Sequence, residues 1–298
     1  MRGSSITKVP GSLGYPENLI GLPDSPSCLY VQGEVLPSDR LAVAIVGTRS
    51  PTPIGRVIAF ELARDLALVG VTIVSGLAAG IDGEAHRGAL STGGRTIACL
   101  GAGPDVIYPK QHQDLYQLVP RSGALVSEYP PGTPPAPWRF PARNRIISGM
   151  SLGVVVVEAG EKSGALLTAD WALKQGRPVM AVPGSPKFGA SVGSNRLIQD
   201  GAYLVMSADD VLSFLGQEGE CLPLARVPKD GPHGQLTLDE ALILEEIEGK
   251  MLNGDEIAGL LPSIPPGKVV SLLSSLEMKG IVERISGGRY LATKKRWN

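Results

Sequence analysis

Short apolar runs rich in β-branched residues alternate with amphipathic segments between residues 40 and 216. The runs Leu41–Val46 and Val71–Val74 predict two buried strands. Between them, apolar residues recur every three or four positions over 57–69, which predicts a helix that ends at Gly70. A strand, a helix and a second strand in this order predict two parallel strands joined by a right-handed crossover. Since both runs carry apolar residues on both faces, we expect helices on both faces of the sheet.

The same alternation continues through the rest of this region. It predicts further strands at Arg95–Leu100, Ala124–Ser127, Leu152–Val157, Pro178–Val182 and Ala202–Val205. It predicts further helices at Asp82–Leu90, Asp114–Val119, 163–176, Asn195–Gln199 and Ser207–Leu215. Asp82 and Ser207 are the predicted N-caps of two of these helices, and Asp210 follows Ser207 by three positions. Regular alternation of this kind indicates one doubly wound α/β domain with a mostly parallel sheet.

The flanking segments have a different character. Residues 1–39 are rich in Gly, Pro and Ser, with one strand-like piece at Cys28–Gln32, and we expect an extended lead-in that packs on the sheet and is not a domain. Residues 217–234 mix charges with Pro and Gly and are interpreted as a linker. Residues 235–298 predict a small winged-helix domain, with helices at Asp239–Gly249, Asn253–Leu260 and Gly267–Lys279 and strands at Ile281–Ile285 and Arg289–Ala292.

Charge and composition narrow the classes of partner. The formal net charge of the 298 residues is −1, so nucleic acid would need a local basic patch. Residues 40–216 hold 16 Lys and Arg against 13 Asp and Glu, whereas residues 235–298 hold 8 against 9. The three cysteines are far apart and form no metal-like pair, which suits a reducing cytoplasm. No apolar run approaches the ~18 residues of a membrane span, so we expect none.

Small residues follow one predicted strand after another. Because the carboxyl ends of parallel strands share one edge of a sheet, these loops should lie side by side, and their backbone N–H groups can approach a ligand closely. We therefore predict a long groove for an anion, although tight turns alone would also explain the pattern. The loops are Gly47-Thr48, Ser75-Gly76, Gly101-Ala102-Gly103, Ser163-Gly164, Pro183-Gly184 and Gly193-Ser194-Asn195.

Arginines and aromatic residues alternate just before the central strand. This combination suits unstacked bases and a phosphate backbone, while a solvated helix face is the alternative. Arg49 and Arg145 are the strongest phosphate candidates, and Tyr108, Lys110, Lys187 and Phe188 would join them from neighbouring loops. The cluster itself comprises Arg139, Phe140, Arg143, Asn144 and Arg145.

Catalysis finds little support in the sequence. His86, His112 and His233 have no metal-ligand companion at helical spacing, and there is no Gly-x-Ser-x-Gly elbow. Acidic residues near the groove could be paired acids, but capping or charge balance explains them better; they are Asp82, Glu84 and Glu158. We therefore expect that the protein is not an enzyme and that it binds no cofactor and no metal ion. The third helix of the tail carries only Lys268 and Lys279 beside Glu277, which favours a protein contact over DNA reading.

Together, several motifs resemble the DNA-processing protein A family, also called Smf, over about Tyr15 to Gly216. They are Val46-Gly47-Thr48-Arg49, Ser75-Gly76-Leu77-Ala78-Ala79-Gly80-Ile81-Asp82, Phe140-Pro141-Ala142-Arg143-Asn144-Arg145-Ile146-Ile147, Ser163-Gly164-Ala165-Leu166-Leu167-Thr168 and Gly193-Ser194-Asn195. The resemblance implies an extended Rossmann-like core that binds single-stranded DNA without sequence preference. It also implies a homodimer that protects incoming DNA and loads the RecA recombinase during natural transformation. Many members carry a helical domain before the stretch resembling Tyr15–Gly33, for which there is almost no room here.

The resemblance also implies which residues contact the strand. Phosphate contacts would fall on Arg49, Lys110, Arg143 and Arg145, with Ser163, Gly164 and Asn195 as hydroxyl or backbone donors. Ser75, Gly76, Phe140, Asn144, Thr168 and Lys187 complete the predicted binding set.

Two other functions remain open at this point. A nucleotide-binding hydrolase of the nucleoside-monophosphate phosphoribohydrolase type has a related core, but its Pro-Gly-Gly-x-Gly-Thr loop differs from Pro183-Gly184-Ser185 here. A transcription regulator acting through the winged tail is the other alternative, and the acidic balance of the tail argues against it.

Overall fold

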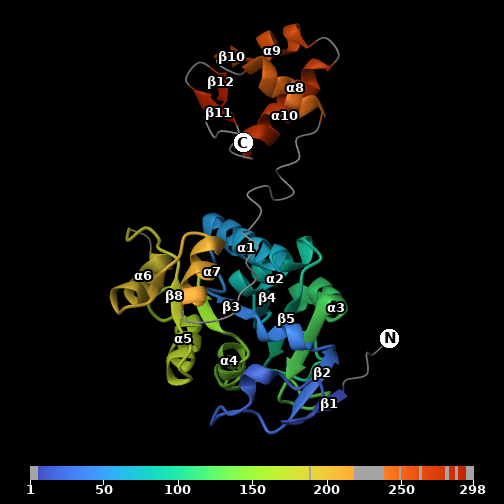
Figure 1. Cartoon of the computed structure of the whole chain (residues 1–298), viewed down its shortest axis with the longest axis vertical. Coiled ribbons are helices and arrows are strands. Elements are labelled where there is room, and N and C mark those ends of the chain that lie inside the picture. Colours follow the sequence, from blue (N-terminus) through green and yellow to red (C-terminus); the bar gives the residue numbers. More distant parts are fainter. Residues whose placement is uncertain are drawn as a thin grey trace. The chain divides into compact units, whose positions relative to one another are not determined.

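The computed structural model describes residues 6–187, 189–217, 238–247, 250–261, 264–278, 282–285 and 288–292. The chain divides into two compact units, Met1–Pro228 and Lys229–Asn298 (Figure 1). Phe188, most of the predicted linker at 217–234, and the basic end Lys294-Lys295-Arg296 lie outside the described residues.

A single mostly parallel sheet forms the first unit. Its strand order is β1-β2-β6-β5-β4-β3-β7-β8-β9, and every neighbouring pair from β6 to β9 is parallel. Only β2 and β1 run antiparallel to their neighbours within the described part of this sheet. The strands are β1 Ile6–Lys8, β2 Leu29–Gly33, β3 Ala42–Val46, β4 Thr72–Ser75, β5 Thr96–Leu100, β6 Gly123–Ser127, β7 Gly153–Val156, β8 Val179–Ala181 and β9 Tyr203–Leu204.

The strand order confirms the predicted doubly wound, Rossmann-like α/β fold. From β3 the chain proceeds outward through β4, β5 and β6, and it then returns to the other side of β3 as β7. The order of strands therefore reverses between β3 and β7. In open α/β sheets this reversal opens a crevice beyond the carboxyl ends of the strands.

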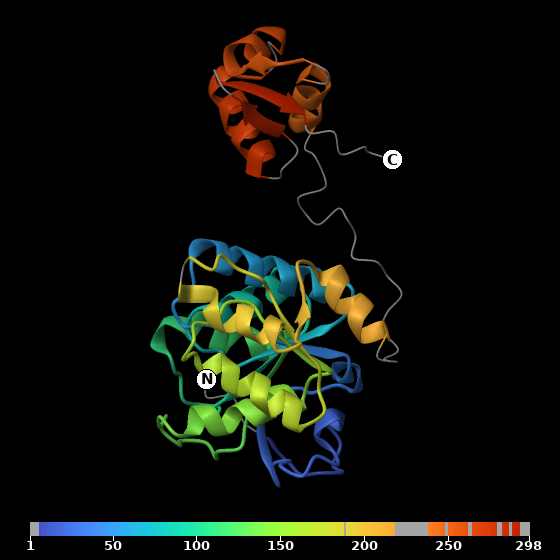
Figure 2. The same ribbon diagram turned by 90° about the vertical axis from the view of Figure 1, so that its left-hand side faces the viewer.

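Helices cover both faces of the sheet (Figures 1 and 2). One face carries α1 Pro53–Leu68, α2 Ile81–Ser91, α3 Gln113–Ser122 and α7 Ala208–Gln217. The other carries α4 Arg139–Gly149, α5 Gly164–Lys174 and α6 Val192–Gln199. The central strand β3 is buried along its whole length, because Val43 and Ile45 pack on the first set while Ala44 and Val46 pack on the second.

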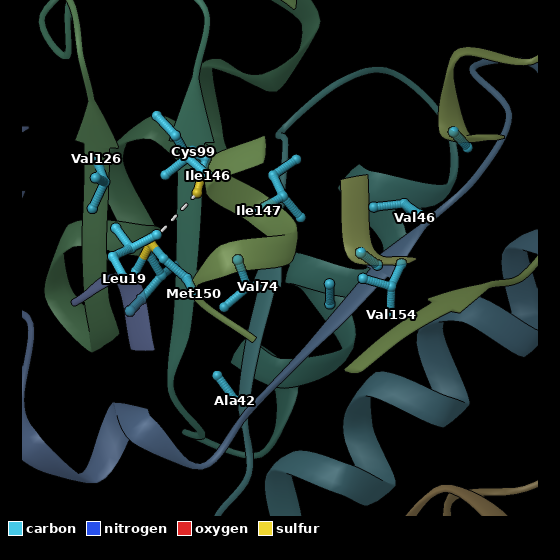
Figure 3. Packing of buried hydrophobic residues seen from close by; sticks show 14 of the residues in the cluster. Leu19, Ala42, Val46, Val74, Cys99, Val126, Ile146, Ile147, Met150 and Val154 are labelled. Atoms are coloured by element: carbon cyan, nitrogen blue, oxygen red, sulfur yellow. Dashed lines mark hydrogen bonds between the residues drawn. The ribbon is translucent and has the colours of Figure 1, made fainter. Parts of the chain in front are cut away.

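The cluster under α4 ties the N-terminal stretch to this core (Figure 3). Leu19 packs there with Ile146 of α4 and with Met150, the C-cap of that helix. The thiol of Cys99 on β5 contacts the Met150 sulfur at 3.7 Å. At the edge of the sheet, β2 pairs with β6, so the N-terminal segment extends the sheet beyond the parallel strands.

Of the two predicted N-caps, one is wrong and the other is confirmed. The Asp82 N-cap is wrong, because α2 begins one residue earlier and Gly80, at φ 84°, is its N-cap. Asp82 turns inward instead, where its Oδ2 accepts hydrogen bonds from the backbone N–H groups of Gly76 (3.1 Å) and Ala78 (3.4 Å). The cap of α7 is confirmed: the Ser207 N–H donates to the Asp210 carboxylate, and the Asp210 N–H donates to the Ser207 hydroxyl.

The second unit has its own apolar core, which includes Ile243, Ile257 and Leu273. Its described elements lie close to the predicted ones, with a short additional strand, β10, that the sequence pattern did not indicate. They are α8 Leu238–Ile247, β10 Leu252–Asn253, α9 Gly254–Leu260, α10 Pro266–Met278, β11 Val282–Ile285 and β12 Arg289–Ala292. The three strands form an antiparallel sheet in the order β10-β12-β11. The winged-helix assignment stays a prediction.

Across the described ranges, no helix is both long and apolar enough to span a membrane.

Candidate nucleic-acid interface

A cleft of about 540 Å³ opens at the reversal point between β3 and β7. Its walls are the loop after β3, the loop after β7 with the start of α5, and one side of α4. It is lined by Val46, Gly47, Thr48, Arg49, Ala78, Asp82, Phe140, Pro141, Arg143, Asn144, Ile147, Gly160, Lys162, Ser163, Gly164, Ala165, Leu167 and Thr168.

The loop after β3 presents Arg49 at the mouth of this cleft. The Thr48 N–H donates to the backbone carbonyl of Glu158 (2.6 Å), and the Thr52 N–H donates to the Glu158 side chain (2.8 Å). Thr52 then caps α1 by accepting from the Gly55 N–H at 3.0 Å. With its backbone held in this way, the loop leaves Arg49 exposed, and its guanidinium lies 5.5 Å from the centre of the Phe140 ring.

The start of α5 forms the opposite wall. Ser163 is its N-cap and accepts from the Ala165 N–H at 3.4 Å, and the Asn144 side-chain amide of α4 donates to the Gly164 carbonyl at 3.2 Å. The first N–H groups of a helix and its dipole favour an anion. Lys162, placed just before this helix start, opposes the dipole, and a bound anion would relieve that repulsion.

Arg143 forms the floor of the cleft. It is 4% exposed, and its Nη1 donates to the Cys99 carbonyl at 2.8 Å while its Nε has no partner within the described structure. Burial lowers the pKa of Arg143, and the nearby Asp82 opposes that shift. Burial raises the pKa of Asp82, whereas Arg143 and the Ala78 and Gly76 amides lower it. A Cβ at Gly76 would collide with the Arg143 guanidinium, so only glycine lets this arginine lie where it does.

Aromatic rings continue the cleft toward β4 and β5. Phe140 stacks on Tyr108, with ring centroids 5.3 Å apart and planes inclined by 25°. A smaller cavity of about 70 Å³ under this pair is also lined by Arg49 and Arg143, so the two hollows share a wall. Gly101 is required here, since its Cβ would lie 2.8 Å from Cδ1 of Phe140.

The cleft brings together many of the residues predicted to bind DNA, and the smaller cavity adds Gly76. Those in the cleft are Arg49, Phe140, Arg143, Asn144, Ser163, Gly164 and Thr168. Ser75 is buried and donates to the Ile45 carbonyl at 2.6 Å, which joins β4 to β3. Asn144 has a structural contact as well, since it holds the start of α5.

Besides Ser75, four residues of the predicted binding set lie outside both hollows. Arg145 does not line the cleft and forms an ion pair with Glu128 at 2.6 Å. The Asn195 amide accepts from the Gly184 N–H (3.0 Å) and donates to the Gly184 carbonyl (2.9 Å), so it joins α6 to the loop after β8. Lys110 begins a short 3-10 helix, and Lys187 lies in the loop after β8; neither lines the cleft or its neighbour.

The sequence interpretation missed Lys162. Its signal was available, because a cation directly before the Ser163 helix cap is unfavourable unless an anion binds there. Among the described residues, no group of three or more His, Cys, Asp and Glu side chains is placed to hold a metal ion.

The fold and cleft define a Rossmann-like α/β protein with cationic and aromatic groups at its switch point. Residues 7–216 match the sequence profile of the family described as DNA recombination-mediator protein A, and the chain belongs to that family. Over 280 residues it is 40% identical to Protein Smf of Escherichia coli, covering 92% of this chain and 74% of that protein.

Two solved structures share the fold. DNA processing protein A of Streptococcus pneumoniae is 40% identical with a TM-score of 0.65, covering 71% of this chain and 75% of that one. DNA processing protein A of Helicobacter pylori, solved for its single-stranded DNA binding mode, is 32% identical with a TM-score of 0.64. That match covers 73% of this chain and 99% of the Helicobacter chain.

Proposed function

We propose that this protein binds single-stranded DNA without sequence preference along the carboxyl edge of its sheet. The observation that carries the proposal is the pairing of charge and ring at one opening: Arg49 lies 5.5 Å from the Phe140 ring, which stacks on Tyr108. Phosphates and base faces are common to every sequence, so a cation beside an aromatic ring binds strands without reading them. The Helicobacter relative, solved with a single-stranded DNA binding mode, supports the same ligand here.

Discrimination against duplex follows from the same geometry. A base can stack on Phe140 only when it is not stacked on its neighbours, and in a duplex the base faces are covered by adjacent base pairs. The cations Arg49 and Lys162 and the start of α5 would take the phosphates on either side. Single strands should therefore bind more tightly than duplexes of equal length.

The proposal includes a non-enzymatic role as a mediator. The acids nearest the cleft are engaged with backbone amides: Glu158 with Thr52, and Asp82 with Gly76. The family description and the DNA-processing names of the relatives support a role in protecting incoming DNA during natural transformation. We further propose that the protein acts as a homodimer and loads RecA onto that DNA.

Fluorescence anisotropy with labelled strands across a salt series tests the binding. Arg49→Ala should raise Kd by about 10- to 150-fold, the equivalent of one charged hydrogen bond of about 1.5–3 kcal/mol. It should also lower the slope of log affinity against log salt by about 0.7 for one lost phosphate contact. Arg121→Ala is the matched control, since Arg121 is exposed in the last turn of α3, just before β6 enters the opposite edge of the sheet.

Unchanged affinity in Arg49→Ala would refute the cleft as the binding site. Mediation is tested separately, by whether the protein lets RecA assemble on strands already covered by single-strand-binding protein. Release of a free base from nucleotides by the purified protein would instead favour the phosphoribohydrolase alternative.

A further inference from the structure

A second aromatic group lies just beyond the residues that line the cleft. Tyr129 follows the end of β6, and Trp138 directly precedes α4. The Arg139 guanidinium lies 4.7 Å from the Tyr129 ring centre and 4.8 Å from that of Trp138. The two rings meet edge to face, with centroids 6.2 Å apart and an angle of 85°. Although Trp138 has these partners, it is 63% exposed, which is unusual for so large an apolar side chain.

The surrounding loops hold this group in place. Arg139 donates through Nη1 to the Pro134 carbonyl. The Gly103 N–H donates to the Thr133 carbonyl at 2.9 Å, which ties the loop after β5 to the loop after β6. The rings therefore belong to a supported surface rather than to a free loop tip.

The nearby carboxylates already have partners within the protein. Glu128 pairs with Arg145 at 2.6 Å, and Asp105 accepts from the Gly132 N–H at 2.7 Å. Acidic groups with such partners repel an incoming phosphate less than free ones would. Arg139 remains as a positive charge between the two rings, which gives the surface the sign that a nucleic acid requires.

This surface continues the cleft. Trp138 lies two residues before Phe140, whose ring stacks on Tyr108 at the end of the cleft. The glycine that admits the Phe140 ring also packs against Arg139, because a Cβ at Gly101 would lie 3.5 Å from the Arg139 carbonyl carbon. The two aromatic groups are thus neighbours on the same edge of the sheet.

We propose that Tyr129, Trp138 and Arg139 form a second base-stacking platform. It takes one further base of the same strand that binds at Phe140. This inference rests on the proposed single-stranded DNA binding and extends the binding path toward β6. Trp offers the largest ring face for a base, and the guanidinium on it adds a cation near the phosphate. The platform would read no sequence, since every base has a ring face.

A tryptophan reporter tests the platform directly. The chain has 3 tryptophans, so Trp171→Phe combined with Trp297→Phe leaves Trp138 as the reporter. Oligo(dT) strands from about 4 to about 16 nucleotides, the range of single-domain sites, are titrated at constant salt. Trp138 fluorescence should be quenched by the long strands and remain unchanged at saturation by the shortest.

Affinity measurements on the full chain complete the test. Trp138→Ala should weaken binding of the longest strand by about 5- to 150-fold and leave the shortest strand near the wild-type value. Trp138→Phe should recover most of the loss, and strands without bases should not distinguish the variants. Trp171→Ala is the matched control, because Trp171 lies on α5 outside the cleft, with Lys174 at 4.9 Å from its ring.

The outcomes separate this inference from the proposed function. If Arg49→Ala weakens binding while Trp138→Ala does not, and Trp138 fluorescence is not quenched by long strands, the platform is refuted and the cleft remains the proposed binding site. An equal loss on short and long strands in Trp138→Ala would also refute the platform, since it would indicate a change in the cleft itself. If Arg49→Ala binds normally, both proposals fail.

Discussion

Two glycines at opposite ends of α5 provide a sharp test of how the cleft holds its ligand. Gly164 begins the helix and lines the cleft, and a Cβ built on it meets nothing within 4 Å. Gly176 follows the helix at φ +67°, also with nothing within 4 Å of a built Cβ. Both positions therefore have room for a methyl group, but only one faces the proposed strand.

The expected effects of the two alanine variants are opposite. Gly164→Ala should stabilise the fold by about 0.4–1 kcal/mol through the unfolded chain, because its helical backbone suits alanine. In the complex its methyl group would keep the phosphate away from the helix start, at a cost of about 1.5–3 kcal/mol, or about 10- to 150-fold in Kd. Gly176→Ala should lose about 1–2 kcal/mol of stability to its left-handed backbone and keep its affinity.

Thermal unfolding and anisotropy on the same preparations measure both quantities. For a domain of this size, 1 kcal/mol shifts Tm by about 2–4 °C, so Gly164→Ala should raise Tm by about 1–4 °C and Gly176→Ala lower it by about 2–8 °C. Binding is measured well below both melting temperatures. Wild-type affinity in Gly164→Ala would refute the close approach of backbone to phosphate at α5, whatever the stability data show.

Two further predictions concern charges outside the opening of the cleft. Arg145→Ala should lower the free energy of unfolding by about 1–3 kcal/mol by leaving Glu128 unpaired, yet weaken DNA binding less than Arg49→Ala does; the reverse ranking in anisotropy would place Arg145 in the interface. His86 is buried with its Nδ1 2.7 Å from the Thr96 hydroxyl, and burial, with His112 and Arg143 nearby, lowers its pKa from 6.5 to about 3. Because unfolded His86 takes up a proton that the folded ring resists, stability should fall as pH drops from 6.5 toward 3, and His86→Gln should flatten that dependence in denaturant titrations. Equal slopes of stability against pH for the wild type and His86→Gln would contradict this account. The raised pKa of Asp82 makes stability rise as pH falls, but it does so in both proteins and does not affect the comparison.

Much of the fold was predictable from local patterns. The runs that became β3, β4 and β7 carry apolar residues on both faces, and a strand buried on both faces needs that composition. Alternation with helices then required parallel strands, and parallel strands place their following loops at one edge. For this reason the pattern of residues was sufficient to assign Arg49, Phe140 and Gly164 to one surface.

Side-chain partners were not predictable in the same way. Asp82 looked like a cap because it stands near a helix start, but the left-handed Gly80 made the turn and freed the carboxylate to face Gly76. Arg145 looked like a phosphate ligand, yet Glu128 reaches it from another loop. Local sequence carries no signal for such a meeting, because it depends on how distant loops pack.

Local sequence was therefore enough to set the order of strands and helices and the small, cationic and aromatic character of the loops at one edge. Those features follow from backbone periodicity and side-chain size, which act over a few neighbouring residues. Which charges remain free for a ligand, and which are neutralised within the fold, depends on contacts between segments far apart in the chain. Packing of those segments buried Arg143 beneath the cleft, paired Arg145 with Glu128, and left Trp138 exposed beside Arg139.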